Sequence, residues 1–284
     1  MKSGRCMILN GEFVTEEEAS VSPLNRGMMY GDGCFETIRF YSGKFLGWQE
    51  HFNRLINGLS YLGMEADFSS HELKESVVRL SDKNKLSDKD AMVRIQCWRK
   101  GERGYKSSSS QVNWMAQIGE ISPKKAPVRL TVANTRCIPD KALSRQYKLS
   151  NGLNYIKAAQ EAKAKNKDDA LMLTISDKIS ETTSANVFWI KNETVFTPSK
   201  NCDLLPGITR SIIVEVCGEQ NIPVHEGAYD LYEIQDAEAV FCTNSLIEIL
   251  DVSAIEDREF QIQHPVVRKI KESFESYKME NLKI

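Results

Sequence analysis

The spacing of apolar residues along the first half of the chain predicts both strands and helices. Short or alternating apolar runs are typical of strands. They predict strands at residues 6–9, 13–14, 35–41, 92–98 and 112–118. Helical spacing predicts one helix from Phe52 to Leu62, followed by Gly63, and a second through residues 73–80 after the cap candidates Ser69 and Ser70. The polar stretch 99–110 between the last two strands is expected to be an exposed loop.

The second half of the chain shows the same mixture of patterns. Strands are predicted at residues 128–132, 170–175, 187–190, 195–197 and 240–243. Helices are predicted at residues 155–165, at 208–217 and after Pro265. Strands and helices in both halves indicate an α+β or α/β fold and exclude an all-β one.

A chain of 284 residues is long enough for about two domains. The best boundary is the polar segment EISPKKAP at residues 120–127, which carries two prolines and precedes a clear strand pattern. We therefore expect an N-terminal domain at 1–119, a linker at 120–127 and a C-terminal domain at 128–284.

Composition narrows the class of protein further. Hydrophobic residues make up 41%, charged residues 27%, and the net charge is −2. These values fit a folded, soluble domain, and the absence of basic runs argues against nucleic acid or an anionic membrane as a partner. No apolar run is long enough for a membrane span or a signal peptide. Seven scattered cysteines without a CxxC pair predict buried thiols in a reducing cytoplasm, and four dispersed histidines predict no metal site.

Four segments could carry chemistry, although each has an ordinary structural interpretation. The glycine-rich stretch 26–37 has Glu36 where a dinucleotide fingerprint needs its third glycine, so by itself it reads as a turn built on Gly31 and Gly33. The segment 204–210, LLPGITR, starts a helix whose free N–H groups could hold a phosphate. Glu181 could be a partly buried carboxylate, and Arg54 could equally lie on a solvated helix face.

Taken together and in this order, these segments resemble the class-IV aminotransferases, the fold-type-IV enzymes that use pyridoxal 5'-phosphate (PLP). The combination RGxxYGDGxFET, HxxRL, a lysine, SExxxxNxF, TP and LPGITR is specific, and it covers nearly the whole chain. The resemblance implies two α/β domains of the D-amino-acid aminotransferase type with PLP in an active site between them. It also implies a homodimer and a small amino compound as substrate.

The resemblance also implies roles for individual residues. Lys148 matches the lysine that forms the Schiff base with PLP, in preference to Lys141 and Lys157. Five further residues match positions that bind the cofactor: Arg54, Glu181, Ile208, Thr209 and Ser245. Of these, Glu181 matches the acid that pairs with the pyridine nitrogen, and the others match donors to the phosphate. Weaker candidates for substrate binding are Tyr30, Arg39, Arg99, Arg103 and Asn244.

The reaction is less sharply indicated than the cofactor. The segment from Gly31 to Phe35, followed by Thr37 and Arg39, is similar to 4-amino-4-deoxychorismate lyases, which release pyruvate and form 4-aminobenzoate for folate synthesis. Glu36 and Glu248 are closer to the transaminases. The resemblance therefore favours the lyase, with a branched-chain or D-amino-acid aminotransferase as the alternative. A binding protein without turnover is a remote third possibility.

Overall fold

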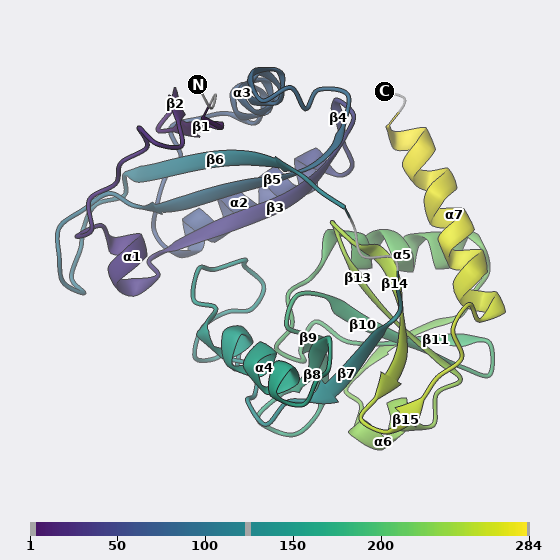
Figure 1. Cartoon of the computed structure of the whole chain (residues 1–284). Coiled ribbons are helices and arrows are strands. Elements are labelled where there is room, and N and C mark those ends of the chain that lie inside the picture. The colour runs from purple at the N-terminus through teal and green to yellow at the C-terminus, as the bar shows by residue number, and fades with distance from the viewer. Residues whose placement is uncertain (1–3, 123–125, 283–284) are drawn as a thin grey trace. The chain divides into compact units, whose positions relative to one another are not determined.

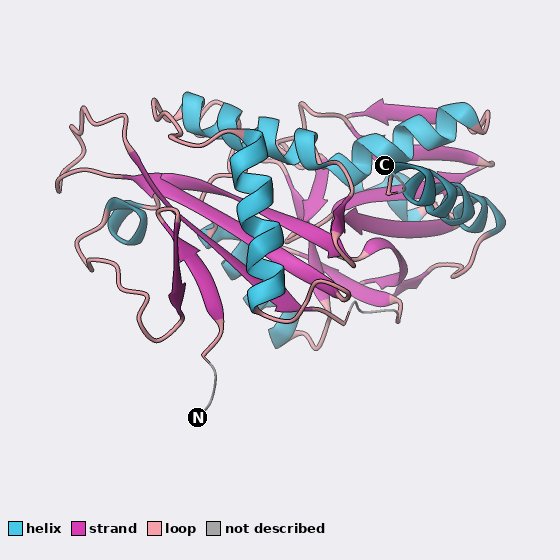
Figure 2. Ribbon diagram, turned by 90° about the horizontal axis from the view of Figure 1, so that it is seen from above, coloured by secondary structure: helices cyan, strands magenta, loops and turns pink. Residues whose placement is uncertain are grey.

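The computed structural model describes residues 4–122 and 126–282, and its contacts divide the chain into two compact units (Figure 1). The first unit comprises Met1–Ser122 together with Tyr147–Asn151, and the second comprises Pro123–Gln146 and Gly152–Ile284. Residues 123–125 of the expected linker lie outside the described residues. Helices and strands occur in both units, which confirms the mixed fold class (Figure 2).

The first unit is built on a six-stranded antiparallel sheet with the order β2-β1-β6-β5-β3-β4. Its strands are β1 (Cys6–Leu9), β2 (Glu12–Thr15), β3 (Gly33–Tyr41), β4 (Lys44–Phe45), β5 (Asp90–Arg99) and β6 (Val112–Glu120). Its helices are α1 (Arg26–Tyr30), α2 (Trp48–Tyr61) and α3 (Ser70–Lys83). Helix α2 packs on β3, and α3 packs on β6 and β1.

Strict alternation along β3 gives this sheet two different faces. Cys34, Glu36 and Ile38 are buried, whereas Phe35 and Thr37 between them are only half-buried. The buried positions face the helices, because successive side chains of a strand point to opposite sides. The expected cap of α3 is confirmed, since Ser69 and the Glu72 side chain form a complete capping box.

The glycine-rich stretch folds into more than a turn. Residues 26–30 form the short helix α1, which the sequence did not predict, and Gly31 ends it with a positive φ of 66°. Gly33 is required for a different reason, because a Cβ at this position would lie 2.2 Å from the carbonyl oxygen of Cys97 on β5. The two glycines thus let the chain leave α1 and enter β3 at once.

The segment Tyr147–Asn151 belongs to the first unit, although its sequence position placed it in the expected C-terminal domain. The physical reason is backbone hydrogen bonding to the start of β3. The amide of Phe35 donates to the carbonyl of Lys148 at 2.9 Å, and the amide of Ser150 donates to the carbonyl of Gly33, also at 2.9 Å. Lys148 is therefore fixed on the first sheet.

The second unit holds a nine-stranded sheet, with most of its strands antiparallel. Its strands are β7 (Val128–Val132), β8 (Asp169–Leu173), β9 (Ile179–Thr182), β10 (Asn186–Lys191), β11 (Thr194–Pro198), β12 (Val224–Gly227), β13 (Ala239–Asn244), β14 (Glu248–Ile255) and β15 (Arg258–Glu259). Its helices are α4 (Leu153–Ala164), α5 (Ile208–Glu219), α6 (Leu231–Gln235) and α7 (Pro265–Asn281).

Pairing of β9 with both β8 and β10 closes part of this sheet into a ring. The ring runs through β10, β13, β14, β7, β8 and β9. Apolar side chains from these strands form one buried core that includes Leu130, Leu171, Trp189 and Val252. This core holds the ends of β9 and β10 in place, where the polar residues described below are found. Among the described residues, no helix is both long and apolar enough to cross a membrane.

Candidate active site

The carboxylate of Glu36 is buried between the first sheet and α2, where it contacts His51 and Arg54. Arg54 on α2 donates to Glu36 on β3 through Nε and Nη2, at 2.7 and 2.8 Å, and Nδ1 of His51 lies 2.8 Å from the same carboxylate. Glu36 and His51 are 1% exposed and Arg54 is 12% exposed. The HxxR spacing places His51 and Arg54 on one side of α2, so both reach the same acid.

The charges of this cluster decide its protonation. Burial opposes ionisation of Glu36, but the charge and hydrogen bonds of Arg54, followed by the contact with His51, lower its pKa to about 2. Burial also lowers the pKa of His51, and the positive charges of Arg54 and Lys148 lower it further. The negative charge of Glu36 raises it, but by less. His51 is therefore a neutral imidazole at neutral pH that donates through Nδ1, and Glu36–Arg54 is a true ion pair.

Lys148 lies against the half-buried face of β3. Its Nζ is 4.7 Å from the centre of the Phe35 ring. Thr37 and Arg39 share this face by alternation, and on the neighbouring β5 Thr37 is paired with Arg94. By contrast, Lys141 and Lys157 are exposed. Among these three lysines only Lys148 lies on a sheet next to other candidate residues.

Arg94 is a candidate that the sequence reasoning missed. Its guanidinium carbon lies 3.9 Å from the centre of the Phe35 ring, and it donates to Gln96 at 3.0 Å. Burial lowers the pKa of this guanidinium, which still stays protonated near neutral pH. The available signal was the alternation of polar Arg94 and Gln96 with apolar Val93 and Ile95 along β5.

Glu181 is held in the second unit by a tight connection between β9 and β10. The two strands pair at Glu181 and Asn186, which explains the spacing of the SExxxxN motif. The carboxylate of Glu181 accepts hydrogen bonds from the Leu205 amide at 3.1 Å and from Asn186 Nδ2 at 3.4 Å. Asn186 also donates to the Leu205 carbonyl at 2.9 Å, so the LPGITR segment is tied to this acid.

Two more residues contact Glu181 that the sequence reasoning did not assign. The hydroxyl of Tyr155 on α4 donates to Glu181 Oε1 at 2.7 Å, and Nη2 of Arg145 donates to the Tyr155 oxygen. Arg145 lies 3.9 Å from Glu181, and both side chains are 6% exposed. Burial and the negative charge of Glu181 raise the pKa of Tyr155 well above its usual value, so the phenol keeps its proton and donates.

The start of α5 is shaped as an open set of N–H donors. Gly207 occupies the N-cap, so no side chain caps the first turn, and Ile208 and Thr209 follow as its first residues. A Cβ at position 207 would lie 2.2 Å from Asn186 Oδ1, so only glycine allows this close approach. Unbonded N–H groups and the positive end of the helix dipole make such a turn a favourable place for a phosphate.

Asn244 is the last residue of β13, and Ser245 begins the turn that follows. Asn244 donates to the carbonyl of Ser184 at 3.0 Å and accepts from the amides of Leu246 and Ile247 at 2.8 and 2.9 Å. The turn is therefore fixed to the β9–β10 connection that carries Glu181. In the second unit, the structure thus brings Glu181, the start of α5 and the turn at Ser245 onto connected segments.

The remaining candidates lie in the first unit and differ in their surroundings. Arg39 forms an ion pair with Asp90 at 2.6 Å, and Tyr30 accepts a hydrogen bond from the Gly104 amide at 3.0 Å. Arg99 donates to Asp32 and to three backbone carbonyls. Arg103 is exposed, and its guanidinium makes no hydrogen bond or ion pair with any residue that the structure describes.

Comparison with known proteins decides the family, because the model of amino-transferase class IV matches residues 33–255. The chain belongs to the class IV aminotransferases. Aminodeoxychorismate lyase of Bacillus subtilis (strain 168) is 28% identical, with 90% of this chain and 88% of that protein covered. D-alanine aminotransferase of Staphylococcus aureus (strain MSSA476) is also 28% identical, with 95% and 97% covered.

Among solved structures, the branched-chain aminotransferase of Thermoproteus uzoniensis with norvaline is 26% identical and has a TM-score of 0.91. The match covers 99% of this chain and 95% of the Thermoproteus uzoniensis chain. Enzymes of the class IV aminotransferase family use PLP and act as transaminases or lyases on small amino compounds. These relatives confirm the family, fold and cofactor that the sequence predicted, and they include representatives of all three candidate reactions.

Proposed function

We propose that this class IV aminotransferase is a 4-amino-4-deoxychorismate lyase, which releases pyruvate and leaves 4-aminobenzoate for folate synthesis. The observation that carries the proposal is the hydroxyl of Thr37 on the face of β3 that also holds Phe35 and Lys148. A transaminase needs one group, the lysine, to move a proton from one carbon to another. An elimination also needs a proton for the departing oxygen, and we assign this relay to the Thr37 hydroxyl because it shares the face of β3 against which Lys148 lies.

The residues of this chain fit PLP by the chemistry of their donors. We assign the phosphate to Arg54, to the first turn of α5 at Ile208 and Thr209, and to Ser245, because a dianion is best held by a cation and by helix N–H groups. Glu181 is assigned to the pyridine nitrogen, since an ionised carboxylate keeps that nitrogen protonated. The glycine at position 207 supports this assignment, because a Cβ there would collide with Asn186, which holds both Glu181 and Leu205.

When bound, PLP supplies an electron-accepting ring that stabilises the charge left by a departing proton. Lys148 would hold PLP through its side-chain amine, and once the substrate amine has displaced it, that amine would be the base that takes the proton from the carbon bearing the substrate nitrogen. The hydroxyl of Thr37 passes its proton to the oxygen of the leaving pyruvate unit and regains one from the Lys148 ammonium. Tyr155 and Asn186 keep Glu181 oriented throughout, through hydrogen bonds of 2.7 and 3.4 Å.

A branched-chain aminotransferase is the second candidate. The likeness to the archaeal branched-chain aminotransferase favours it, and so does Glu36, the residue that carries the Arg54 ion pair and that resembles the transaminases. A D-amino-acid aminotransferase follows from the staphylococcal relative. In either case Lys148 would move the proton alone and Thr37 would be dispensable.

Two assays on purified enzyme distinguish these candidates. The first supplies 4-amino-4-deoxychorismate and detects pyruvate, and the second supplies leucine or D-alanine with 2-oxoglutarate and detects glutamate. The lyase proposal requires pyruvate in the first assay and no more than a trace of glutamate in the second. Thr37→Val should lower pyruvate release by roughly 100-fold, whereas Thr37→Ser should retain most of it. Glutamate formation that is unaffected by Thr37→Val would overturn the proposal.

Two controls test the cofactor assignments themselves. Lys148→Ala should remove the visible absorbance of bound PLP near 410–430 nm, an expected order of magnitude for a PLP imine. Arg54→Ala should weaken PLP retention, while Glu181→Ala should impair turnover more than retention. A colourless protein that takes up no PLP would instead favour a binding protein without turnover.

We further propose that the enzyme is a cytoplasmic homodimer. Six buried thiols favour a reducing compartment, and the family resemblance favours a dimer. Light scattering coupled to size-exclusion chromatography tests the second point. A mass of one chain at micromolar concentration would contradict it.

A further inference from the structure

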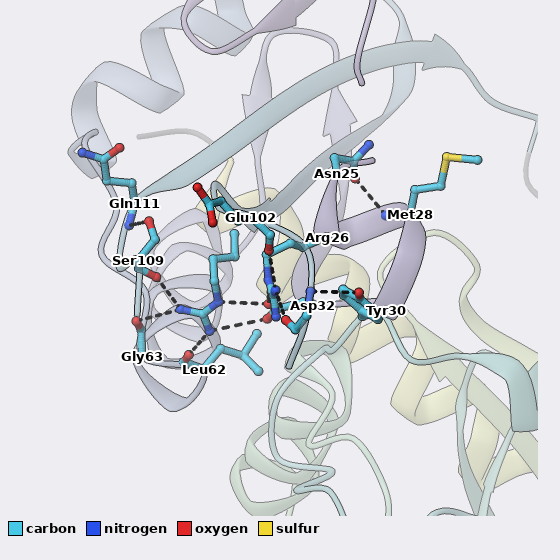
Figure 3. A network of polar contacts seen from close by, with 12 residues as sticks. Asn25, Arg26, Met28, Tyr30, Asp32, Leu62, Gly63, Glu102, Ser109 and Gln111 are labelled. Carbon is cyan, nitrogen blue, oxygen red and sulfur yellow. Dashed lines mark hydrogen bonds and ion pairs between the residues drawn. The ribbon is translucent and has the colours of Figure 1, made fainter. Parts of the chain in front are cut away.

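A buried ion network joins α1, the start of β3 and the end of β5 in the first unit (Figure 3). Asp32 Oδ2 accepts from Arg26 Nε at 2.7 Å and from Arg99 Nε at 2.9 Å. The three side chains are only 5% to 13% exposed. Burial alone would raise the pKa of Asp32, but the hydrogen bonds and charges of Arg99 and Arg26 lower it, so the acid stays ionised between two cations.

The other N–H groups of these arginines hold the backbone of one loop. Arg26 Nη1 donates to the carbonyls of Glu102, at 2.9 Å, and of Gly104, and Arg99 Nη1 donates to the carbonyl of Ser109 at 2.7 Å. Arg99 also donates to the carbonyls of Leu62 and Gly63 at the end of α2. Figure 3 shows these contacts around Arg26 and Asp32. The loop between β5 and β6 is thus attached to the fold on both of its sides.

The loop that is held in this way is basic and exposed. Between residues 100 and 111 its charged side chains are Lys100, Glu102, Arg103 and Lys106, all exposed. Three cations and one carboxylate leave a net charge of +2. Burying three charges costs desolvation free energy, so such a network is seldom the most favourable way to stabilise a fold. A rigid basic loop, however, binds an anion with less loss of conformational entropy than a mobile one.

The same loop is connected to the Lys148 segment through Tyr30. The Tyr30 hydroxyl accepts from the Gly104 amide at 3.0 Å, and its ring lies 5.3 Å from the ring of Tyr105. On its other side, the Tyr30 carbonyl accepts from Asn151 Nδ2 at 3.3 Å. All of these residues belong to the first unit, so the basic loop and the segment that carries Lys148 share one neighbour.

We propose that Asp32 is a positioning residue for substrate binding. Acting through Arg26 and Arg99, it fixes the basic loop beside the Lys148 segment, where Arg103 binds a carboxylate of the substrate. Arg99 then has a different task from Arg103, because its N–H groups hold protein carbonyls. This inference rests on the proposed function for the carboxylate substrate and for Arg103 as its candidate partner, and what it adds is the role of Asp32 in holding the loop.

The test is a double-mutant cycle on the PLP-loaded enzyme with whichever substrate it turns over. Asp32→Asn keeps the shape of the side chain and removes its charge, and Arg103→Gln removes the loop cation. Each should raise KM about tenfold or more while kcat changes by less than about threefold and the PLP absorbance stays. The double variant should be no worse than the weaker-binding single variant, because both act through one contact.

A matched control is Asp177→Asn, which breaks the exposed Arg136–Asp177 pair of 2.7 Å in the second unit and should leave KM unchanged. An unchanged KM in folded Asp32→Asn, effects that add in the double variant, or a fall of kcat in parallel with KM would each overturn the proposal. If Asp32→Asn does not fold, Arg99→Lys replaces it in the cycle with the same criteria.

Limited trypsin digestion separates this inference from the proposed function, because it needs no substrate. Trypsin cleaves after lysine and arginine, and the loop offers Lys100, Arg103 and Lys106. Cleavage there should be slow in the native enzyme and at least severalfold faster in Asp32→Asn, with no change in Asp177→Asn. Equal cleavage rates would overturn the positioning role even in an active enzyme. A protein without turnover or PLP absorbance would instead sink the proposed function.

Discussion

Two buried acids, Glu36 and Glu181, each accept several hydrogen bonds, and their partners explain why a carboxylate is tolerated at these positions. Glu36 is neutralised by Arg54 in a two-bond pair, and Glu181 is bound by an amide, a carboxamide and a phenol. Breaking a buried pair leaves one charge uncompensated, which costs more than the pair contributes. Loss of the partners of either acid should therefore lower the stability of the fold.

The pH dependence of stability should reveal the Glu36 pair. The pKa of Glu36 falls from 4.5 to about 2 in the folded protein. The contribution of the ion pair to the free energy of unfolding is therefore complete above about pH 5 and is lost as the pH drops toward 2. Glu36→Gln should lower the free energy of unfolding by about 3 kcal/mol at pH 7. The difference in the free energy of unfolding between Glu36→Gln and the native protein, measured by urea unfolding, should become smaller at about pH 3. Glu120→Gln, on an exposed pair, is the control, and an equal gap at both pH values would contradict the assignment.

Cysteine reactivity provides a second test at the scale of single residues. Burial raises the pKa of Cys34 and Cys137 to about 12 and that of Cys217 to about 11. At pH 8 the thiolate fraction at a pKa of 12 is on the order of one in ten thousand. Cys6 is half-buried, unlike the other six. Iodoacetamide should therefore label Cys6 first in the native protein, and mass spectrometry of peptides identifies the site. Early labelling of Cys34 would show that β3 opens.

At the scale of elements, α5 allows a controlled test because one glycine, Gly207, is its N-cap and another, Gly218, lies near its end in different surroundings. Gly207→Ala would push a Cβ to 2.2 Å from Asn186 Oδ1, so it should displace the side chain that holds Glu181 and Leu205. We expect PLP affinity to fall by about tenfold, a loss of one or two hydrogen bonds, in equilibrium dialysis.

The matched control is Gly218→Ala in the same helix. A Cβ at position 218 meets no atom within 4 Å, so alanine should raise stability by about 0.5–1 kcal/mol and leave PLP affinity unchanged. A similar loss of affinity in both variants would mean that helix propensity, not the Asn186 contact, governs the site.

Elements with local signals could be predicted from the sequence, and elements defined by distant pairing could not. The cap candidates Ser69 and Ser70 located the start of α3 because a helix cap is a local signal, and Ser69 forms a capping box with Glu72. Strand β14 was missed because it is fixed by pairing with β13 and, in parallel, with β7, more than a hundred residues earlier. Helix α1 was missed because a single helical turn has almost no period to detect.

The candidate site follows the same rule. Glu181 and the LPGITR segment could be proposed from the sequence because a resemblance preserves their order and spacing. The partners Arg145 and Tyr155 lie 36 and 26 positions before Glu181, so no local pattern links them to it. Arg94 could have been identified from the sequence, since its alternation with Val93 and Ile95 places it on one face of a predicted strand.

At the scale of the whole molecule, the proposed PLP donors are divided between the two units. Arg54 and Lys148 belong to the first, whereas Glu181 and Thr209 belong to the second. A ligand held by both units stabilises only the state in which both are folded. At 100 times the dissociation constant, PLP should therefore raise the stability of each unit by about 2.7 kcal/mol.

Hydrogen exchange with mass spectrometry measures the stability of each unit separately, through peptides of β5 in the first unit and of β10 in the second. Both should gain protection on addition of PLP, and pyridoxal, which lacks the phosphate, should protect both far less. Arg54→Ala and Thr209→Val change different units, yet each should reduce the protection of both, because each removes a proposed donor to the same ligand. Protection confined to a single unit would contradict the division of the phosphate donors, since the cofactor would then be bound by that unit alone.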